Sequence, residues 1–331
     1  STSVLRGAPH LYINFPEPLD SSPRPQTSRY WGKTDARDAY VIADQARMRR
    51  DLRPIRPGDE AVIELKLLTA RRADLVEDRT RVVNRLRGTL LSMFPALERA
   101  LDVTNTGPLR LLTGYQTPAA IRRAGVIRLT KWLANRKVRN ARALAEAAVE
   151  AAERQHTAIP GEQTITKLVH TLAEEVMALN EQISEVDKLI EGGFHEHELA
   201  EIVLSVPGIG TVLGAEFLAA VGGGLNEFDS PDALAAFAGV APAPRDSGKV
   251  SGNLHRPVTY HRRLQRVFYT SALLSVRYDP NSRMFYDRKR AEGKKHVQAV
   301  LALARRRVNV IWALIRDRRC YEVTPPVTEA A

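Results

Sequence analysis

The stretch that decides the fold runs from Val203 to Leu274 and reads VLSVPGIGTVLGAEFLAAVGGGLNEFDSPDALAAFAGVAPAPRDSGKVSGNLHRPVTYHRRLQRVFYTSALL. Proline and glycine at residues 206–210 predict a turn between two helices, and small apolar residues at 211–221 predict the second of them. Residues 232–238 predict a short alanine-rich helix after a loop that ends in a cap. Two prolines then stop this helix and open a serine-containing loop, and a basic helix follows.

The turn contains Gly208 and Gly210. Glycine adopts dihedral angles that other residues avoid and lets a phosphate approach the backbone. The amides at the start of the next helix also favour an anion. One interpretation is therefore a helix-hairpin-helix-like turn that binds a phosphate without recognising bases. The other is a connection between two helices that binds nothing.

The loop that follows contains two Ser-Gly pairs, Ser247-Gly248 and Ser251-Gly252. A serine that attacks a phosphodiester needs an exposed hydroxyl, a flexible backbone and cations for the developing charge. The alternative is a serine that only forms a turn. The nearby residues that we expect to contact nucleic acid, with the first turn of the basic helix included, are Arg245, Lys249, His255, Arg256, Arg262 and Arg263.

Asp35 and Asp38 form a second candidate site upstream. If residues 34–50 are helical, a spacing of three places both carboxylates on one face. Two convergent carboxylates suit a hard divalent cation such as Mg²⁺. An aspartate pair on a helix surface that is simply solvated is the alternative.

Five runs together carry a resemblance to a known family: KTDARDA at 33–39, PGIGTVLGAEFLAAVG, FDSPDALAAFAGVAP, RDSGKVSGNLHR and HRRLQRVFYTSA. Over residues 29–318 the chain resembles the DEDD transposases of bacterial insertion sequences, the family numbered one hundred and ten, which are also known as bridge-RNA-guided recombinases. The order of the runs makes a chance match improbable.

The resemblance implies an RNase H-like (RuvC-like) domain in which Asp35 and Asp38 hold Mg²⁺. It implies that Ser247 attacks a DNA phosphodiester to form a covalent protein–DNA intermediate, with Ser251 as the rival nucleophile. It also implies a structured guide RNA and assembly into dimers and tetramers. Two departures stand out: residues 259–262 lack the family's Lys-x-Gly-Asn turn, and the family's first Asp and its Glu have no counterpart before Asp35. We therefore expect a chain truncated at its N-terminus.

Two other functions fit the sequence. A truncated remnant that binds nucleic acid without cutting it would explain the missing acids. An unrelated Holliday-junction nuclease is the third possibility, although hydrolytic nucleases do not require a Ser-Gly loop.

Residues 59–94 and 163–190 carry two long apolar stripes of helical period. They predict a long antiparallel coiled-coil stalk, with a helical cap over residues 107–155. The coiled coil either joins subunits, as in the family, or packs within one chain. The expected stripe on the second helix is Ile165, Leu168, Leu172, Val176, Leu179, Ile183, Val186 and Ile190.

Basic residues crowd both the first long helix and the cap, and sequence-independent contact with phosphates of DNA or guide RNA would explain them. Trp132 among them is either a base-stacking platform or a half-buried core residue. The basic residues of the first long helix are Arg71, Arg72, Arg79, Arg81, Arg85 and Arg87, and those of the cap are Arg122, Arg123, Arg128, Lys131, Arg136, Lys137, Arg139 and Arg142.

The whole chain has 331 residues, a formal net charge of +11 and a pI near 9.9, which indicate a polyanionic partner. No apolar run approaches the length of a membrane span, and the single Cys320 excludes an intramolecular disulfide. We expect a cytoplasmic, mainly α protein. Its expected parts are a partial RNase H-like α/β domain at 1–55, the stalk and cap at 56–195, a helical C-terminal transposase domain at 196–320, and a disordered tail at 321–331.

Overall fold

The computed structural model describes residues 60–156, 161–244, 254–255 and 257–323. This part of the chain is mainly helical, as predicted, and it divides into two compact units. Residues 66–196 form one unit, and residues 60–65 with 197–323 belong to the other. The predicted RNase H-like domain, the helix proposed for residues 34–50 and the tail beyond residue 323 lie outside the described residues.

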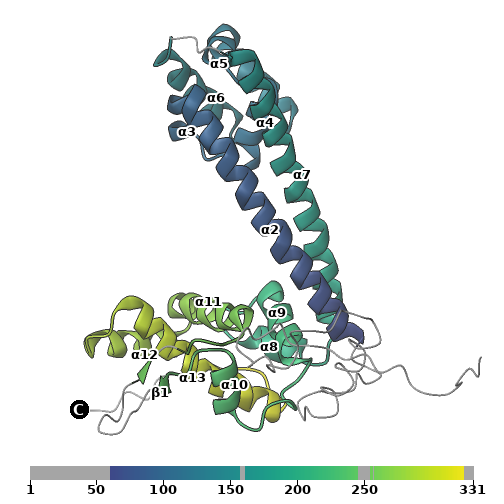
Figure 1. The fold of residues 1–331 in the computed structure, drawn as a ribbon, viewed down its shortest axis with the longest axis vertical. Helices are drawn as coiled ribbons and strands as arrows, with labels where there is room; N and C mark the ends of the chain where they lie inside the picture. The colour runs from purple at the N-terminus through teal and green to yellow at the C-terminus, as the bar shows by residue number, and fades with distance from the viewer. Residues whose placement is uncertain (1–59, 157–160, 245–253, 256, 324–331) are drawn as a thin grey trace, which may run out of the picture. The chain divides into compact units, whose positions relative to one another are not determined.

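Two long helices build the first unit. Helix α2 (Glu60–Met93) and helix α7 (Glu162–His195) run side by side in opposite directions (Figure 1). Arg72 Nε lies 2.5 Å from Asp187 Oδ1. More than three turns further along α2, Arg85 Nη2 lies 3.7 Å from Glu175 Oε1. The partner number on α7 falls as the number on α2 rises, so the pairs establish the antiparallel direction.

Six of the seven residues expected to form the apolar stripe of α2 are buried, and the seventh, Leu68, is half-buried. The six are Leu65, Leu75, Val82, Leu86, Leu90 and Met93. On α7 one expected position was wrong. Leu168 is 48% exposed, and Val169 is fully buried in its place. Val169, Leu172, Val176 and Leu179 follow one another at steps of three, four and three, which keeps them on a single face, whereas Leu168 falls on its flank.

Four shorter helices gather at one end of this hairpin (Figure 1). They share one apolar core with α2 and α7. The hydroxyl of Thr117 accepts the amide of Ala120 at 3.1 Å and so caps the start of the third of them. The four helices, which we call the cap, are α3 (Pro95–Ala100), α4 (Thr106–Gly114), α5 (Pro118–Asn135) and α6 (Ala141–Glu153).

Trp132 is a half-buried residue of the cap core, the second of its two predicted roles. Its ring meets that of Tyr115 edge-on at 5.3 Å and lies directly against Gly114. The guanidinium of Arg136 covers its face, 3.6 Å from the ring centroid. The indole face that a base would need is therefore occupied.

The second unit contains six helices and one pair of two-residue strands among its described residues. Phe217 and Phe268 meet edge-on in its core at 6.0 Å. The elements are α8 (Ala200–Ser205), α9 (Thr211–Val221), α10 (Pro231–Phe237), β1 (Ala243–Pro244), β2 (Leu254–His255), α11 (Arg262–Tyr278), α12 (Pro280–Ala291) and α13 (His296–Arg316).

Helix α12 was not predicted, although its start carries a recognisable signal. Asp279 is the N-cap, and its carboxylate accepts the amide of Ser282 at 2.9 Å, while Pro280 fills the first helical position. Asp followed by Pro is a typical helix start.

Arg307 on α13 is a second correction. The sequence predicts a final helix over residues 295–316 with Arg305, Arg306 and Arg307 on one basic side. Arg307 is instead only 4% exposed and lies on the core side. Its Nε and Nη2 atoms lie 3.0 and 2.7 Å from the hydroxyl oxygen of Ser271 on α11, and Nη2 also donates to the carbonyl of Pro207. Burial lowers the pKa of this guanidinium to about 10, so it stays charged at neutral pH.

None of the helices in the described ranges combines the length and the apolar character needed to cross a membrane.

The contact between Gly114 and Trp132 predicts opposite effects for two glycine-to-alanine changes in the first unit. A Cβ on Gly114 would overlap the indole ring, so Gly114→Ala should lower the free energy of unfolding by about 2 kcal/mol. Gly88 lies in α2 with nothing near a Cβ, so Gly88→Ala should raise it by about 0.5–1 kcal/mol. Urea unfolding of both variants followed by circular dichroism measures the two effects, and equal effects would contradict the packing described.

Candidate nucleic-acid interface

The structure describes five of the predicted site residues: Gly208, Gly210, His255, Arg262 and Arg263. The others lie outside the described residues, namely Asp35, Asp38, Arg245, Ser247, Lys249, Arg256 and the alternative nucleophile Ser251. The interface is therefore built here from the elements that flank the serine loop, residues 245–253.

A short antiparallel pair joins the two ends of the serine loop. Ala243 lies opposite His255, and Pro244 lies opposite Leu254. The pair was not predicted, because the two-residue strands are too short for an alternating pattern. It sets the entry and exit of the loop next to each other, with the exposed His255 at the exit.

The segments outside this pair are anchored to the start of α11. Gly239 has φ of 66°, and its Cα lies so close to the Tyr260 ring that a Cβ would overlap it. The carbonyl of Gly239 accepts Gln265 Nε2 at 3.0 Å, and the His261 amide donates to the carbonyl of Phe237 at 2.8 Å. The base of the serine loop is thus held at the N-terminal end of α11.

That end of α11 carries the predicted cations. His261 is the N-cap, and its Nδ1 accepts the amide of Leu264 at 3.0 Å. Arg262 is exposed and Arg263 is half-buried. Cations in the first turn of a helix meet an unfavourable dipole, so an anion placed there is stabilised by the side chains and the helix terminus together.

Glu216 is a residue that the sequence analysis missed. It lies on α9, its side chain is 3% exposed, and it forms an ion pair with Arg266 of α11, which is half exposed. Its second carboxylate oxygen is buried without a hydrogen-bond partner. Glu216 is the one charged residue of α9, and a lone acid in an otherwise apolar helix is the signal that would have found it.

The predicted turn lies between α8 and α9, and its two glycines face different surroundings. Gly208 has φ of 80°, and a Cβ there would lie 2.6 Å from the carbonyl oxygen of Ser271 on α11. Gly210 is exposed, is the N-cap of α9, and has nothing within 4 Å of a Cβ. Packing against α11 accounts for glycine at 208, whereas the amides after Gly210 lie at an exposed helix start.

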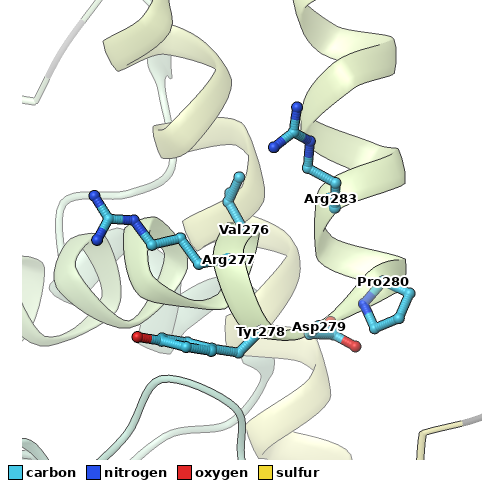
Figure 2. Close-up of a pocket in the computed structure, with 6 residues that line it drawn as sticks. All are labelled: Val276, Arg277, Tyr278, Asp279, Pro280 and Arg283. Atoms are coloured by element: carbon cyan, nitrogen blue, oxygen red, sulfur yellow. The ribbon is translucent and has the colours of Figure 1, made fainter.

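A small pocket of about 450 Å³ lies where α11 passes into α12. Figure 2 shows Arg277 and Arg283 on two different helices around it, with the Tyr278 ring below them. Tyr278 is 73% exposed. The acidic residue of the lining, Asp279, is engaged by Ser282 and by the Tyr321 hydroxyl at 3.2 Å. Arg283 pairs with Asp287 at 2.7 Å, so the exposed Arg277 is the cation of this lining without an ion pair among the described residues.

The Mg²⁺ site stays a prediction. In the ranges that the structure describes, no group of three or more His, Cys, Asp or Glu residues is placed to hold a metal ion. The two predicted ligands, Asp35 and Asp38, fall outside these ranges.

Two family models match the chain. One, described as a DEDD transposase of the IS110 type, covers residues 6–95, and the other, described as the transposase IS116/IS110/IS902 family, covers residues 200–287. The first extends upstream of residue 29, where the resemblance in the sequence analysis began. The second spans the PGIG turn, the serine loop and α11.

Relatives at high identity agree with these matches. The chain is 55% identical over 301 residues to the 42 kDa protein of insertion element IS900 of Mycobacterium paratuberculosis, covering 91% of the chain and 75% of that protein. It is 53% identical over 301 residues to the 44.8 kDa protein of IS116 of Streptomyces clavuligerus, which again covers 91% of the chain and 75% of that protein. The chain belongs to the IS110/IS116/IS902 transposase family. A putative transposase of the IS117 mini-circle of Streptomyces coelicolor is similar at 28% identity over 88% of the chain and 72% of that protein.

The two glycines of this transposase's turn predict different responses to alanine. Gly208→Ala should lower the free energy of unfolding by about 2 kcal/mol or more, because it adds both strain at positive φ and overlap with α11. Gly210→Ala should change it by less than about 1 kcal/mol, because its φ of −104° suits alanine. Urea unfolding measures both, and a Gly210→Ala loss as large as that of Gly208→Ala would contradict the assignment.

Proposed function

We propose that this transposase binds DNA and cuts and rejoins it through Ser247. The observation that carries the proposal is the β1–β2 pair, which joins the two ends of the serine loop. Ala243 follows Gly239 by four residues, and Gly239 packs on Tyr260 next to the start of α11. The base of the serine loop is therefore connected by only a few residues to the start of α11, which carries Arg262 and Arg263.

The proposed chemistry is a pair of phosphoryl transfers. The Ser247 hydroxyl oxygen attacks the phosphorus of a DNA phosphodiester, and its proton passes to solvent. The bond from phosphorus to the leaving deoxyribose oxygen breaks, and that oxygen takes up a proton as a free hydroxyl. Attack of a strand hydroxyl on the phosphoserine ester then rejoins DNA and releases the serine. Arg262 and Arg263 offset the added negative charge on the phosphate oxygens.

Asp35 and Asp38 would hold Mg²⁺, since carboxylate oxygens are the hard ligands this ion prefers. A bound Mg²⁺ supplies charge neutralisation at phosphate oxygens. The family match over residues 6–95 includes both aspartates and so supports this assignment.

A guide RNA that selects the target and assembly into a homo-oligomer complete the proposal. The α2–α7 hairpin supports an oligomer joined through a coiled coil, because four leucines on it are exposed. Leu67 and Leu189 lie toward one end, and Leu91 and Leu168 lie toward the other, with exposed fractions of 67%, 58%, 48% and 48%. Leucines exposed at matching levels on two helices favour burial against a second copy.

The covalent step predicts a protein–DNA adduct. Full-length protein incubated with Mg²⁺, labelled donor DNA and RNA transcribed from the flank of the element should form a species that survives denaturing electrophoresis and disappears with protease. Ser247→Ala should abolish it because the attacking oxygen is gone. Asp35→Ala should abolish it because one of the two carboxylates that hold Mg²⁺ is gone.

Ser251→Ala is the matched control and should keep the adduct. Loss in Ser251→Ala with retention in Ser247→Ala would move the nucleophile to Ser251. Salt-sensitive DNA binding with no adduct in the wild type would mean that the chain binds without cutting. Omission of the RNA tests the guide.

The exposed leucines predict the outcome of a second experiment. Leu91→Glu combined with Leu168→Glu places two charges where the proposed partner hairpin packs, so the mass measured by light scattering should fall toward that of one chain. Glu substitutions at Lys66 and Lys188, exposed residues of the same hairpin, control for added charge. An unchanged mass in the leucine variant would contradict association through this face.

A further inference from the structure

The cap contains a long run of sequence without acidic residues. Residues 103–145 include nine arginines and lysines and no aspartate or glutamate. The run covers α4, α5 and the start of α6. A local excess of this size creates a positive potential, which attracts a polyanion wherever the cations lack internal partners.

Four of the nine cations have internal partners. Arg110 donates to the carbonyl of Arg136, and Arg122 donates to the carbonyls of Ala152 and Gln155 at the end of α6. Arg136 stacks on Trp132. Arg142 Nε pairs with Glu146 at 2.8 Å. These side chains are engaged within the cap, and the charge of Arg142 is offset by a carboxylate.

The other five cations are all exposed, and none has an ion pair or hydrogen bond to another described residue. We call them the cap cation surface: Arg123, Arg128, Lys131, Lys137 and Arg139.

The backbone of α5 decides where these side chains lie. Gly125, with φ of 67° and ψ of 170°, breaks the helix into two segments. In the second segment Leu129 and Leu133 are buried, while Arg128 and Lys131, three residues apart, share the exposed face. Lys137 and Arg139 follow in the turn before α6. The cations thus continue along one helix face into the adjoining turn.

No described acid of the cap forms an ion pair with these five cations, and three of the acids are held by other partners. Glu146 and Glu150 lie on α6 and pair with Arg142 and Arg154 of the same helix. Asp102, before α4, accepts hydrogen bonds from Thr104 and Asn105, which lower the pKa of its carboxyl. Each of these carboxylates is therefore occupied by a partner other than the five cations.

We propose that the cap cation surface binds the phosphate backbone of a nucleic-acid duplex. This surface would add a second nucleic-acid contact, in the unit that does not contain the serine loop. The proposal rests on the proposed function, because it requires that the chain binds nucleic acid. The contact is to phosphates because the Trp132 face is covered by Arg136 and five solvent-facing cations bind by charge. Each phosphate neutralised releases condensed counterions, so the contact makes binding salt-dependent.

The test is the salt dependence of duplex binding by full-length Arg128→Gln/Lys131→Gln. Fluorescence anisotropy gives the dissociation constant for a DNA duplex and for an RNA duplex of about 30 base pairs, between about 50 and 200 mM salt. The slope of log affinity against log salt should fall in magnitude by about 2. Affinity at 0.1 M salt should fall by about 10-fold to 100-fold.

The matched control is Arg142→Gln/Arg154→Gln, which removes the same charge from paired positions in the cap. The control should change the slope by less than about 0.5, since the two arginines that it removes pair with glutamates and contribute little to phosphate binding. An equal loss in both double variants would overturn the proposal and leave a general charge effect, and an unchanged slope on both duplexes in the Arg128/Lys131 variant would also overturn it. A reduced slope on one duplex identifies whether DNA or RNA is bound.

The same titration separates this inference from the proposed function. If the wild type binds neither duplex, both proposals fail. If the wild type binds and forms the Ser247 adduct while the Arg128/Lys131 variant keeps the full slope, only the cap contact fails.

Discussion

The second unit depends on one buried charge, the guanidinium of Arg307. It lies on α13 and donates to Ser271 of α11 and to the carbonyl of Pro207 in the turn before α9. A buried cation is tolerated only where its donors find acceptors, so a shift of α11 or of the turn would remove one of its two acceptors. Its pKa of about 10 keeps it charged, and the constraint therefore holds at neutral pH.

This constraint explains why the two glycines of one turn have different surroundings, one packed against α11 and the other exposed. With the Pro207 carbonyl held by Arg307, Gly208 packs its Cα onto the backbone of α11, and no side chain fits between them. The chain then leaves Gly210 at the exposed start of α9. On the same α9, Glu216 pairs with Arg266 of α11, so this helix also holds a cation of its neighbour in place.

The sequence predicted most helices and few of their long-range partners. Helical period located α2, α7, α9 and α13 to within a few residues, because burial of one face leaves a regular mark. Period does not report ion pairs, and Arg307 was placed on the wrong side because its acceptors lie far away in sequence at Ser271 and Pro207. The base of the serine loop was missed for the same reason, since Gly239 and Tyr260 meet only in the fold.

The arginines of α2 show how a count of basic residues overstates affinity for nucleic acid. Arg72 pairs with Asp187, Arg79 donates to Asn180 at 2.5 Å and to the carbonyl of Thr104 at 2.8 Å, and Arg85 lies by Glu175. These side chains hold the hairpin together, although composition alone predicted for them the same phosphate-binding role as for the cap cations. A net charge of +11 does not separate the two groups, but the distribution of carboxylates does. A cation whose field is already compensated by an acid gains little from a phosphate, whereas the five of the cap cation surface gain the whole interaction. The arrangement of acids, more than the number of arginines, thus determines which surface of this transposase attracts a polyanion.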